Sequence, residues 1–170
     1  MRRMTLPYIT MAVALSILTW HSTSCSAEIK TLQEFQNSLF IKKYSQSKPM
    51  ESWPLKAGGY SNSFTFDLKI DKNSLVFLEI LTNSKDNPTI YRYSMIFHAG
   101  YTKQMKSFFY DFFSTVDSSV DSKAVNDYIQ KQAAVKLRKS SDAPKKTFGK
   151  YSVRVGNVLN AVTISIDKGS

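Results

Sequence analysis

The sequence predicts a single α+β domain, built on a mostly antiparallel sheet of about five strands with helices packed on one face. Two observations support this fold class. Segments with the period of a strand follow one another through short polar turns, which is typical of an antiparallel meander. Segments with the period of a helix lie before and after the meander, and a hairpin closes the chain. With 42% hydrophobic residues, the 170-residue chain can fill one core.

The first predicted element is a helix over residues 31–43, TLQEFQNSLFIKK. Thr31 and Glu34 form a capping-box pattern, in which a hydroxyl and a carboxylate bond the free amides of the first turn. The apolar residues of the segment recur at helical spacing, and two lysines end it, which suits the helix dipole.

Residues 45–63 form the longest irregular segment, because prolines, a Gly-Gly pair and several serines interrupt any period. The segment carries two large aromatic residues, Trp53 and Tyr60. Such a loop either folds back on the core or presents a binding surface. If it binds, Trp53 and Tyr60 are the candidate anchors, since aromatic residues dominate the binding energy of many interfaces.

Three strands are predicted next, over residues 64–70, 75–82 and 89–97. The first alternates apolar and polar residues, as a half-buried strand does, and the second is nearly continuously apolar, as a central strand is. Short polar turns join them, which predicts a meander. Arg92, in the third strand, is a candidate binding residue and a potential partner across the sheet for Glu79, in the second.

Two helices are predicted after the meander, over residues 102–117 and about 122–139. The first carries four phenylalanines at steps that place them on one broad apolar face. This stripe is typical of a helix that lies on a sheet, and the alternative is a lipid pocket between the helix and the sheet.

The chain is predicted to close with a loop over residues 140–146 and a hairpin of two strands, 150–155 and 158–166. Gly156 and Asn157 predict the turn of this hairpin, because glycine readily adopts the positive φ that a two-residue turn requires.

The N-terminus has the order of an export signal, which assigns residues 1–27 to a signal peptide and residues 28–170 to the domain. Two arginines are followed by an apolar run of ten residues, MAVALSILTW, and then by small residues. The run is too short for a helix that spans a bilayer, which needs about 20 residues. A buried N-terminal helix is the alternative.

Cys25 is the only cysteine, and its position allows three interpretations. Cleavage after Ala27 leaves small residues at the positions that signal peptidase prefers and starts the mature chain at Glu28. Lipidation of Cys25 is the second interpretation, although Ser22 stands where a bacterial lipoprotein signal has an aliphatic residue. A free thiol is the third. We favour cleavage, which predicts a periplasmic or extracellular protein, whereas lipidation would anchor it in the envelope.

The charge balance predicts a protein partner, and an acidic protein is one candidate. The formal charge is +10, and it becomes +8 without residues 1–27, which hold two arginines and no acid. A basic exported protein can meet nucleic acid, an acidic membrane or an acidic protein. The cations are dispersed, and export argues against nucleic acid. A membrane is expected only through a lipid anchor at Cys25.

The sequence offers little catalytic chemistry. Zinc sites need about four ligands, and residues 28–170 contain one histidine, so neither a metal nor another cofactor is expected. His98, at a predicted strand end, is a candidate general base, and Glu79 is a carboxylate whose pKa would rise if it were buried. No GxSxG or phosphate-binding motif accompanies them.

We therefore expect an exported, non-catalytic protein-binding protein of the bacterial cell envelope. Immunity to a toxin, exclusion of an incoming element and service to a secretion apparatus all suit a small basic domain, and the residues do not choose among them. The alternatives are a small envelope hydrolase that uses His98 or Glu79, and a lipoprotein that binds a lipid or another small ligand.

Overall fold

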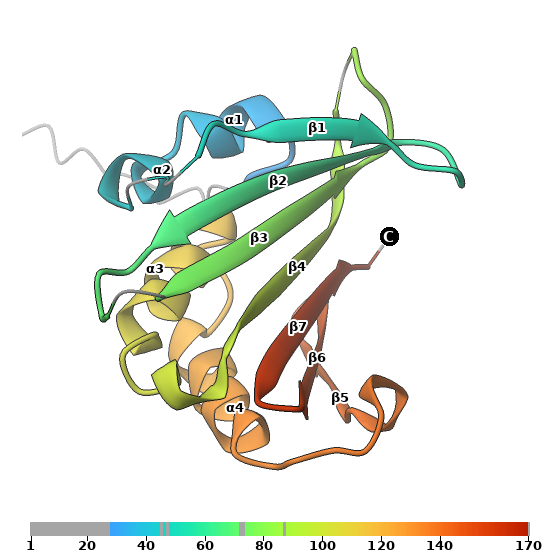
Figure 1. The fold of residues 1–170 in the computed structure, drawn as a ribbon. Coiled ribbons are helices and arrows are strands. Elements are labelled where there is room, and N and C mark those ends of the chain that lie inside the picture. The colour runs from blue at the N-terminus through green and yellow to red at the C-terminus, as the bar shows by residue number, and fades with distance from the viewer. Residues whose placement is uncertain (1–27, 45, 47, 72–73, 87, 170) are drawn as a thin grey trace, which may run out of the picture.

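The computed structural model describes residues 28–169 except 45, 47, 72, 73 and 87. The predicted signal peptide and Cys25 lie outside the described residues. The described chain forms one α+β body, with a seven-stranded antiparallel sheet and helices on one face of it (Figure 1). The predicted fold class is confirmed, and the predicted number of about five strands is wrong.

Helices flank the strands of the meander, as the sequence predicts. The helices are α1 (Leu32–Gln36), α2 (Leu39–Lys43), α3 (Lys106–Val116) and α4 (Ser122–Ala133), with short 3₁₀ helices η1 (Ala99–Tyr101) and η2 (Ser140–Asp142). The strands are β1 (Glu51–Pro54), β2 (Tyr60–Asp67), β3 (Leu75–Thr82), β4 (Ile90–His98), β5 (Lys145–Phe148), β6 (Tyr151–Val158) and β7 (Ala161–Lys168). None of the described helices is long and apolar enough to span a bilayer.

Two meanders make the sheet. Strands β1 to β4 pair in chain order, β5 to β7 pair in chain order, and β4 pairs with β7, which gives the order β1-β2-β3-β4-β7-β6-β5. At this junction Tyr93 stands opposite Ile166, and Ser94 stands opposite Ser165. The sheet twists strongly, so that β1 and β7 run in very different directions (Figure 1).

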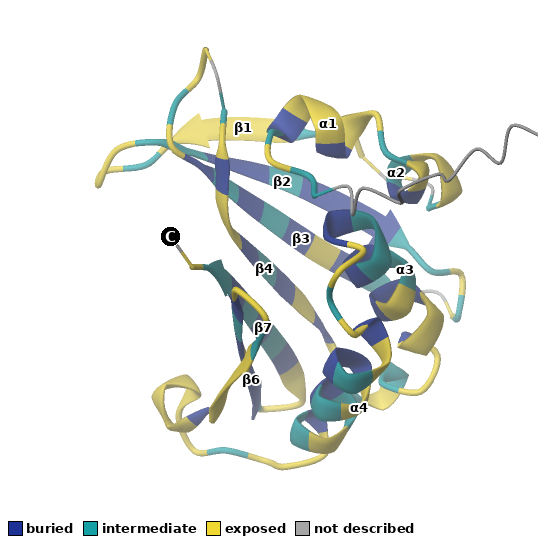
Figure 2. Ribbon diagram, turned by 180° about the vertical axis from the view of Figure 1, so that it is seen from behind, coloured by how far each residue is buried: buried dark blue, intermediate teal, exposed yellow. Residues whose placement is uncertain are grey.

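The core lies between the sheet and the helices, and aromatic rings fill much of it. The ring centroids of Phe112 on α3 and Tyr93 on β4 are 5.3 Å apart, and those of Phe40 and Phe108 are 5.0 Å apart. Along β3 and β4, buried residues alternate with more exposed ones (Figure 2). The phenylalanine stripe of α3 is therefore part of the core, and its rings occupy space between the helix and the sheet.

The two strands that the sequence analysis missed are the edges of the sheet. Strand β1 lies inside the predicted irregular segment 45–63, and β5 overlaps the predicted loop 140–146. Each has four residues that are almost all exposed, so neither shows the apolar alternation of a half-buried strand. Short edge strands that carry lysine or proline are a common means of preventing further strand pairing.

Three helix predictions are longer than the helices that form, and α3, predicted over residues 102–117, covers only Lys106–Val116. The predicted helix 31–43 is broken at Ser38, whose Oγ accepts a hydrogen bond from the amide of Ile41 and so starts α2. Helix α4 ends at Ala133 rather than near residue 139. The side-chain amide of Asn157 donates to the Ala133 carbonyl at 2.7 Å, which satisfies one of the free groups at the helix end.

The first long strand is displaced toward the N-terminus. Strand β2 covers Tyr60–Asp67, whereas residues 64–70 were predicted. The amide of Lys69 donates to Asp67 Oδ1 at 2.8 Å, and Lys69 has a left-handed φ of 54°. The chain therefore leaves the sheet before Ile70, although apolar and polar residues continue to alternate in the sequence as far as Ile70.

The C-terminal hairpin turns at Leu159 and Asn160, not at Gly156 and Asn157. Both turn residues have positive φ, 52° and 63°, which is the type I′ geometry that matches the twist of paired strands. Gly156 and Asn157 lie inside β6. A Cβ at Gly156 would lie 3.4 Å from the Cβ of Ala143, so the glycine allows the chain that precedes β5 to pack closely on β6.

Candidate functional site

The α-helices cover one face of the sheet, and among the described residues no α-helix lies over the opposite face, which we name the open face (Figures 1 and 2). Alternate side chains of each strand reach this face, because successive side chains of a strand point to opposite sides. On β3 and β4 they are the exposed or half-buried residues between the buried residues of the core. The open face is thus a surface on which the sheet can meet another molecule.

Large apolar side chains gather on the open face. Phe77 on β3 stands directly opposite Ile96 on β4, and each is 44% exposed. Leu75 and Leu159 line the same hollow, and Leu159 is 95% exposed. We call these four residues the apolar patch. The hollow is open and has a volume of about 300 Å³, and His98 also lines it.

Two of the three predicted binding residues point to the open face. Trp53 on β1 and Arg92 on β4 are the ends of one row of directly opposed residues that crosses β2 and β3. Trp53 is 42% exposed. Tyr60 precedes Ser61, the residue opposite Trp53, so its side chain points to the helix side. The structure therefore brings Trp53 and Arg92 onto one face and separates Tyr60 from them.

Arg92 does not pair with Glu79, the partner considered for it from the sequence. The guanidinium of Arg92 pairs with Asp167 across the junction of β4 and β7. The Glu79 carboxylate instead accepts a hydrogen bond of 2.5 Å from Ser61 Oγ on β2. Register explains the difference, because Glu79 stands opposite Ser94 rather than Arg92.

The two catalytic candidates lie apart on the open face. Glu79 stands opposite Ser94, four residues before His98 on β4, which places the two positions roughly 13 Å apart along the strands. His98 Nδ1 accepts a hydrogen bond from the amide of Gly100 at 3.2 Å. Ser61, which contacts Glu79, is fully buried and is therefore not an accessible nucleophile. In this arrangement Glu79 and His98 lie too far apart to form a hydrogen-bonded pair.

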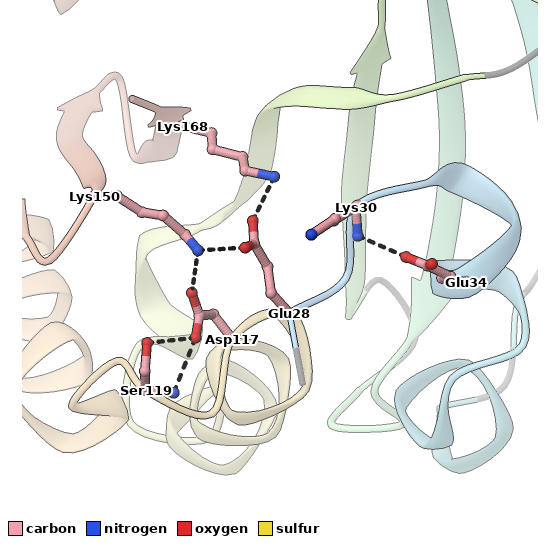
Figure 3. Close-up of polar contacts among 7 residues, drawn as sticks. All are labelled: Glu28, Lys30, Glu34, Asp117, Ser119, Lys150 and Lys168. Carbon is pink, nitrogen blue, oxygen red and sulfur yellow. Dashed lines mark hydrogen bonds and ion pairs between the residues drawn. The ribbon is translucent and has the colours of Figure 1, made fainter. Parts of the chain in front are cut away.

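A cluster of ion pairs, which we name the ionic clamp, lies on the helix side and consists of Glu28, Asp117, Lys150 and Lys168 (Figure 3). Lys150 Nζ lies 2.5 Å from Glu28 Oε2 and 2.8 Å from Asp117 Oδ2, and Lys168 also pairs with Glu28. The amide and hydroxyl of Ser119 donate to Asp117 Oδ1 at 2.9 and 2.6 Å. The clamp ties the segment before α1 to the end of α3 and to β7.

The electrostatics of the ionic clamp favour a structural role. Burial raises the pKa of the Glu28 and Asp117 carboxyls, but the lysine contacts outweigh it and hold both pKa values below their ordinary range. Burial opposes the charge of Lys150, yet its two carboxylate partners raise its pKa. Burial, followed by the nearby carboxylates, raises the pKa of the Tyr93 and Tyr151 hydroxyls. All five groups therefore keep one protonation state near pH 7.

No sequence pattern singles out the apolar patch or the ionic clamp. The nearly continuous apolar run at residues 75–82 predicts a central strand, and in the fold Phe77 on this strand is half-exposed. The run carries apolar residues for both faces of the strand, but the helices can cover only one face of the sheet. That mismatch is the signal that could have found the patch. The clamp residues are single charges far apart in the sequence, and no spacing links them.

Neither a metal site nor a known relative indicates the function. Among the residues that the structure describes, no three His, Cys, Asp or Glu side chains gather as metal ligands would. Comparison of the chain with protein-family models, curated proteins and solved structures gave no match. The surface chemistry of the chain itself is therefore the basis for a proposal.

Proposed function

We propose that this protein is an exported, non-catalytic protein of the bacterial cell envelope that binds an acidic protein on the open face of its sheet. The observation that carries the proposal is the pair Phe77 and Ile96, each 44% exposed, on a face that no α-helix of the described chain covers. The export part rests on the sequence pattern of residues 1–27.

The apolar patch has the character of an interface centre. Protein interfaces place large apolar and aromatic side chains at the middle and polar groups around them. Phe77 and Ile96 stand opposite each other on two inner strands, and Trp53 lies on the same face at the edge strand β1. Burying the exposed parts of these side chains under a partner would remove apolar surface from water, which favours association.

The charge of the surrounding surface favours an acidic partner. Lys145 on β5 and Arg154 on β6 stand directly opposite each other, and both are exposed. Lys136, Arg138 and Lys139 are also exposed and precede β5 in the chain. Complementary charge accelerates encounter and selects partners more than it adds affinity. A partner with carboxylates around an apolar centre would match this surface.

The experiment compares capture of envelope proteins by the wild-type protein and by two matched variants. Phe77→Thr with Ile96→Thr removes the apolar pair and keeps β-branched residues, which suit a strand. Tyr110→Gln is the control, because Tyr110 on α3 is 50% exposed on the helix side. Quantitative mass spectrometry then measures which proteins each variant retains, and circular dichroism verifies that all three fold.

We expect one acidic protein to be retained by the wild type and by Tyr110→Gln, and to be lost by at least tenfold with the double Thr variant. Equal retention by all three folded proteins would refute the proposal. A sedimentation measurement that shows a wild-type dimer and a monomeric double Thr variant would also refute it, because the open face would then bind a second copy of the chain.

A further inference from the structure

Beside the apolar patch, the open face has a second and smaller hollow with a volume of about 150 Å³. It spans β4, β7 and β6, and its polar lining on these strands consists of Ser94, Thr163, Ser165 and Arg154. Ser140 and Ala143 form a wall that comes from the connection between α4 and β5. The hollow is thus rich in hydroxyl groups and contains one guanidinium.

The connection between α4 and β5 is held against the sheet at this point. It runs from α4 past the turn of β6 and β7 (Figure 1), and the amide of Leu137 donates to the carbonyl of Asn157 at 2.8 Å. Gly156 forms part of the floor, where a side chain would press on Ala143 and on Thr163 Oγ1, 3.4 and 3.3 Å from its Cβ position. Glycine therefore keeps this part of the hollow free of a side chain.

Register aligns the polar groups of the hollow in one row. Ser94 stands directly opposite Ser165, and Ser165 stands directly opposite Arg154. Directly opposed residues have their Cβ atoms about 4.5–5.5 Å apart, so two hydroxyls and a guanidinium span roughly 10 Å. Lys145 continues the row at the edge strand, because it stands opposite Arg154. These four side chains can all donate hydrogen bonds, and two of them are cations. On the other side of Ser94 the row continues to Glu79, whose carboxylate accepts a hydrogen bond from Ser61 Oγ.

Arg154 differs from Arg92, the other arginine on the open face. Asp167 pairs with Arg92 and neutralises it. Within the described part of the chain, no carboxylate pairs with Arg154, and the side chains of Ser94 and Ser165 have no hydrogen-bond partner. A planar guanidinium and free hydroxyl donors are the groups that bind a carboxylate with two or more hydrogen bonds.

We infer that this hollow binds a carboxylate, and that the carboxylate is an Asp or Glu side chain of the acidic partner. The inference rests on the proposed function for the origin of the carboxylate. Ser94 and Ile96 lie two residues apart on β4 and point to the same face, about 7 Å from each other. A partner segment that places a carboxylate in the hollow therefore places a neighbouring side chain on the apolar patch.

The test uses two peptides that differ only in charge. N-acetyl-Leu-Glu-Leu-amide and N-acetyl-Leu-Gln-Leu-amide are titrated into ¹⁵N-labelled protein, purified in the form that the expression host exports, and amide shifts are followed by NMR. We expect the Glu peptide to shift the amides of Ser94 and Ser165 and to bind about tenfold more tightly or better, as charge-assisted hydrogen bonds predict.

Three variants locate the effect. Arg154→Gln should remove the preference for the Glu peptide, Arg154→Lys should restore part of it, and Lys42→Gln, which removes an exposed cation from α2, should leave it unchanged. Equal affinity for both peptides, or a preference that survives Arg154→Gln, would overturn the inference. The two proposals can fail separately. If the double Thr variant loses its protein partner but the peptides show no preference, only the inference about the hollow fails. If the Glu peptide is preferred but no protein partner depends on Phe77, only the proposed function fails.

Discussion

Replacing Lys150 by methionine should destabilise the fold far more than the loss of an ordinary surface lysine. Lys150 is the centre of the ionic clamp, where its ammonium contacts Glu28 and Asp117 at 2.5 and 2.8 Å. Methionine keeps most of the length of the side chain and removes the charge. Glu28 then retains Lys168, whereas Asp117 retains only its hydrogen bonds from Ser119.

The expected loss of unfolding free energy is about 2–3 kcal/mol. Removing one partner of a fully buried ion pair costs about 3–5 kcal/mol, because a charge remains buried without compensation. The side chain of Asp117 is only 2% exposed, which favours a large effect, but that of Lys150 is 38% exposed, so water can replace part of the lost interaction. In a domain of this size, such a loss lowers the melting temperature by roughly 5–10 °C.

Urea denaturation at pH 7, followed by circular dichroism, measures this loss. Lys43→Met is the matched control, because Lys43 pairs with Asp111 at 2.6 Å but its side chain is 59% exposed, and such pairs contribute about 1 kcal/mol or less. Adding Asp117→Asn to Lys150→Met should recover part of the stability, since the uncompensated charge disappears. Equal losses for Lys150→Met and Lys43→Met would refute the reasoning.

Three further predictions concern pH, backbone and surface. The folded state holds the pKa values of Glu28 and Asp117 below their ordinary values of 4.5 and 3.8, so both carboxylates stabilise the fold. This stabilisation is complete at a pH above the ordinary pKa values, and it is lost as the pH falls through the lowered pKa values. The melting temperature should therefore fall in acid, and an unchanged value at pH 2.5 would contradict this. In urea denaturation, Gly59→Ala should lower the free energy of unfolding clearly more than Gly58→Ala. Both glycines have positive φ, but only at Gly59 would the new Cβ lie 2.2 Å from the Thr82 carbonyl oxygen. Trp53→Ala should cost less than about 1 kcal/mol and weaken partner binding, whereas a loss like that of a core residue would place Trp53 in the core.

The parts of the fold with strong periodicity could be predicted from the sequence. The continuous apolar run of β3 and the phenylalanine stripe of α3 mark a central strand and a helix on the sheet, and both form as expected. The edge strands β1 and β5 could not be predicted, because they are short and exposed and depend on pairing with β2 and β6. The hairpin turn was misplaced because Gly156 serves close packing rather than a turn.

The candidate site was predictable only in part. Trp53 and Arg92 were proposed as binding residues from their types alone, and it is the register of β1 to β4 that places them on one face. Phe77 and Ile96 have the same residue types as core positions, and what distinguishes them is that none of the α-helices in the described part of the chain lies over this face. Side-chain type indicates what can bind, and strand register decides which side chains lie together.

Site-specific photo-crosslinking tests the central claim most directly. A benzophenone amino acid replaces Phe77 in one variant and Tyr110 in another, and cells of the natural host that make each variant are irradiated. We predict that the probe at position 77, on the open face, links the protein to one distinct acidic protein, and that the probe at position 110, on α3, does not. A probe at position 77 that yields no adduct, or only an adduct with a second copy of the chain, would contradict the proposal that the open face binds an acidic protein.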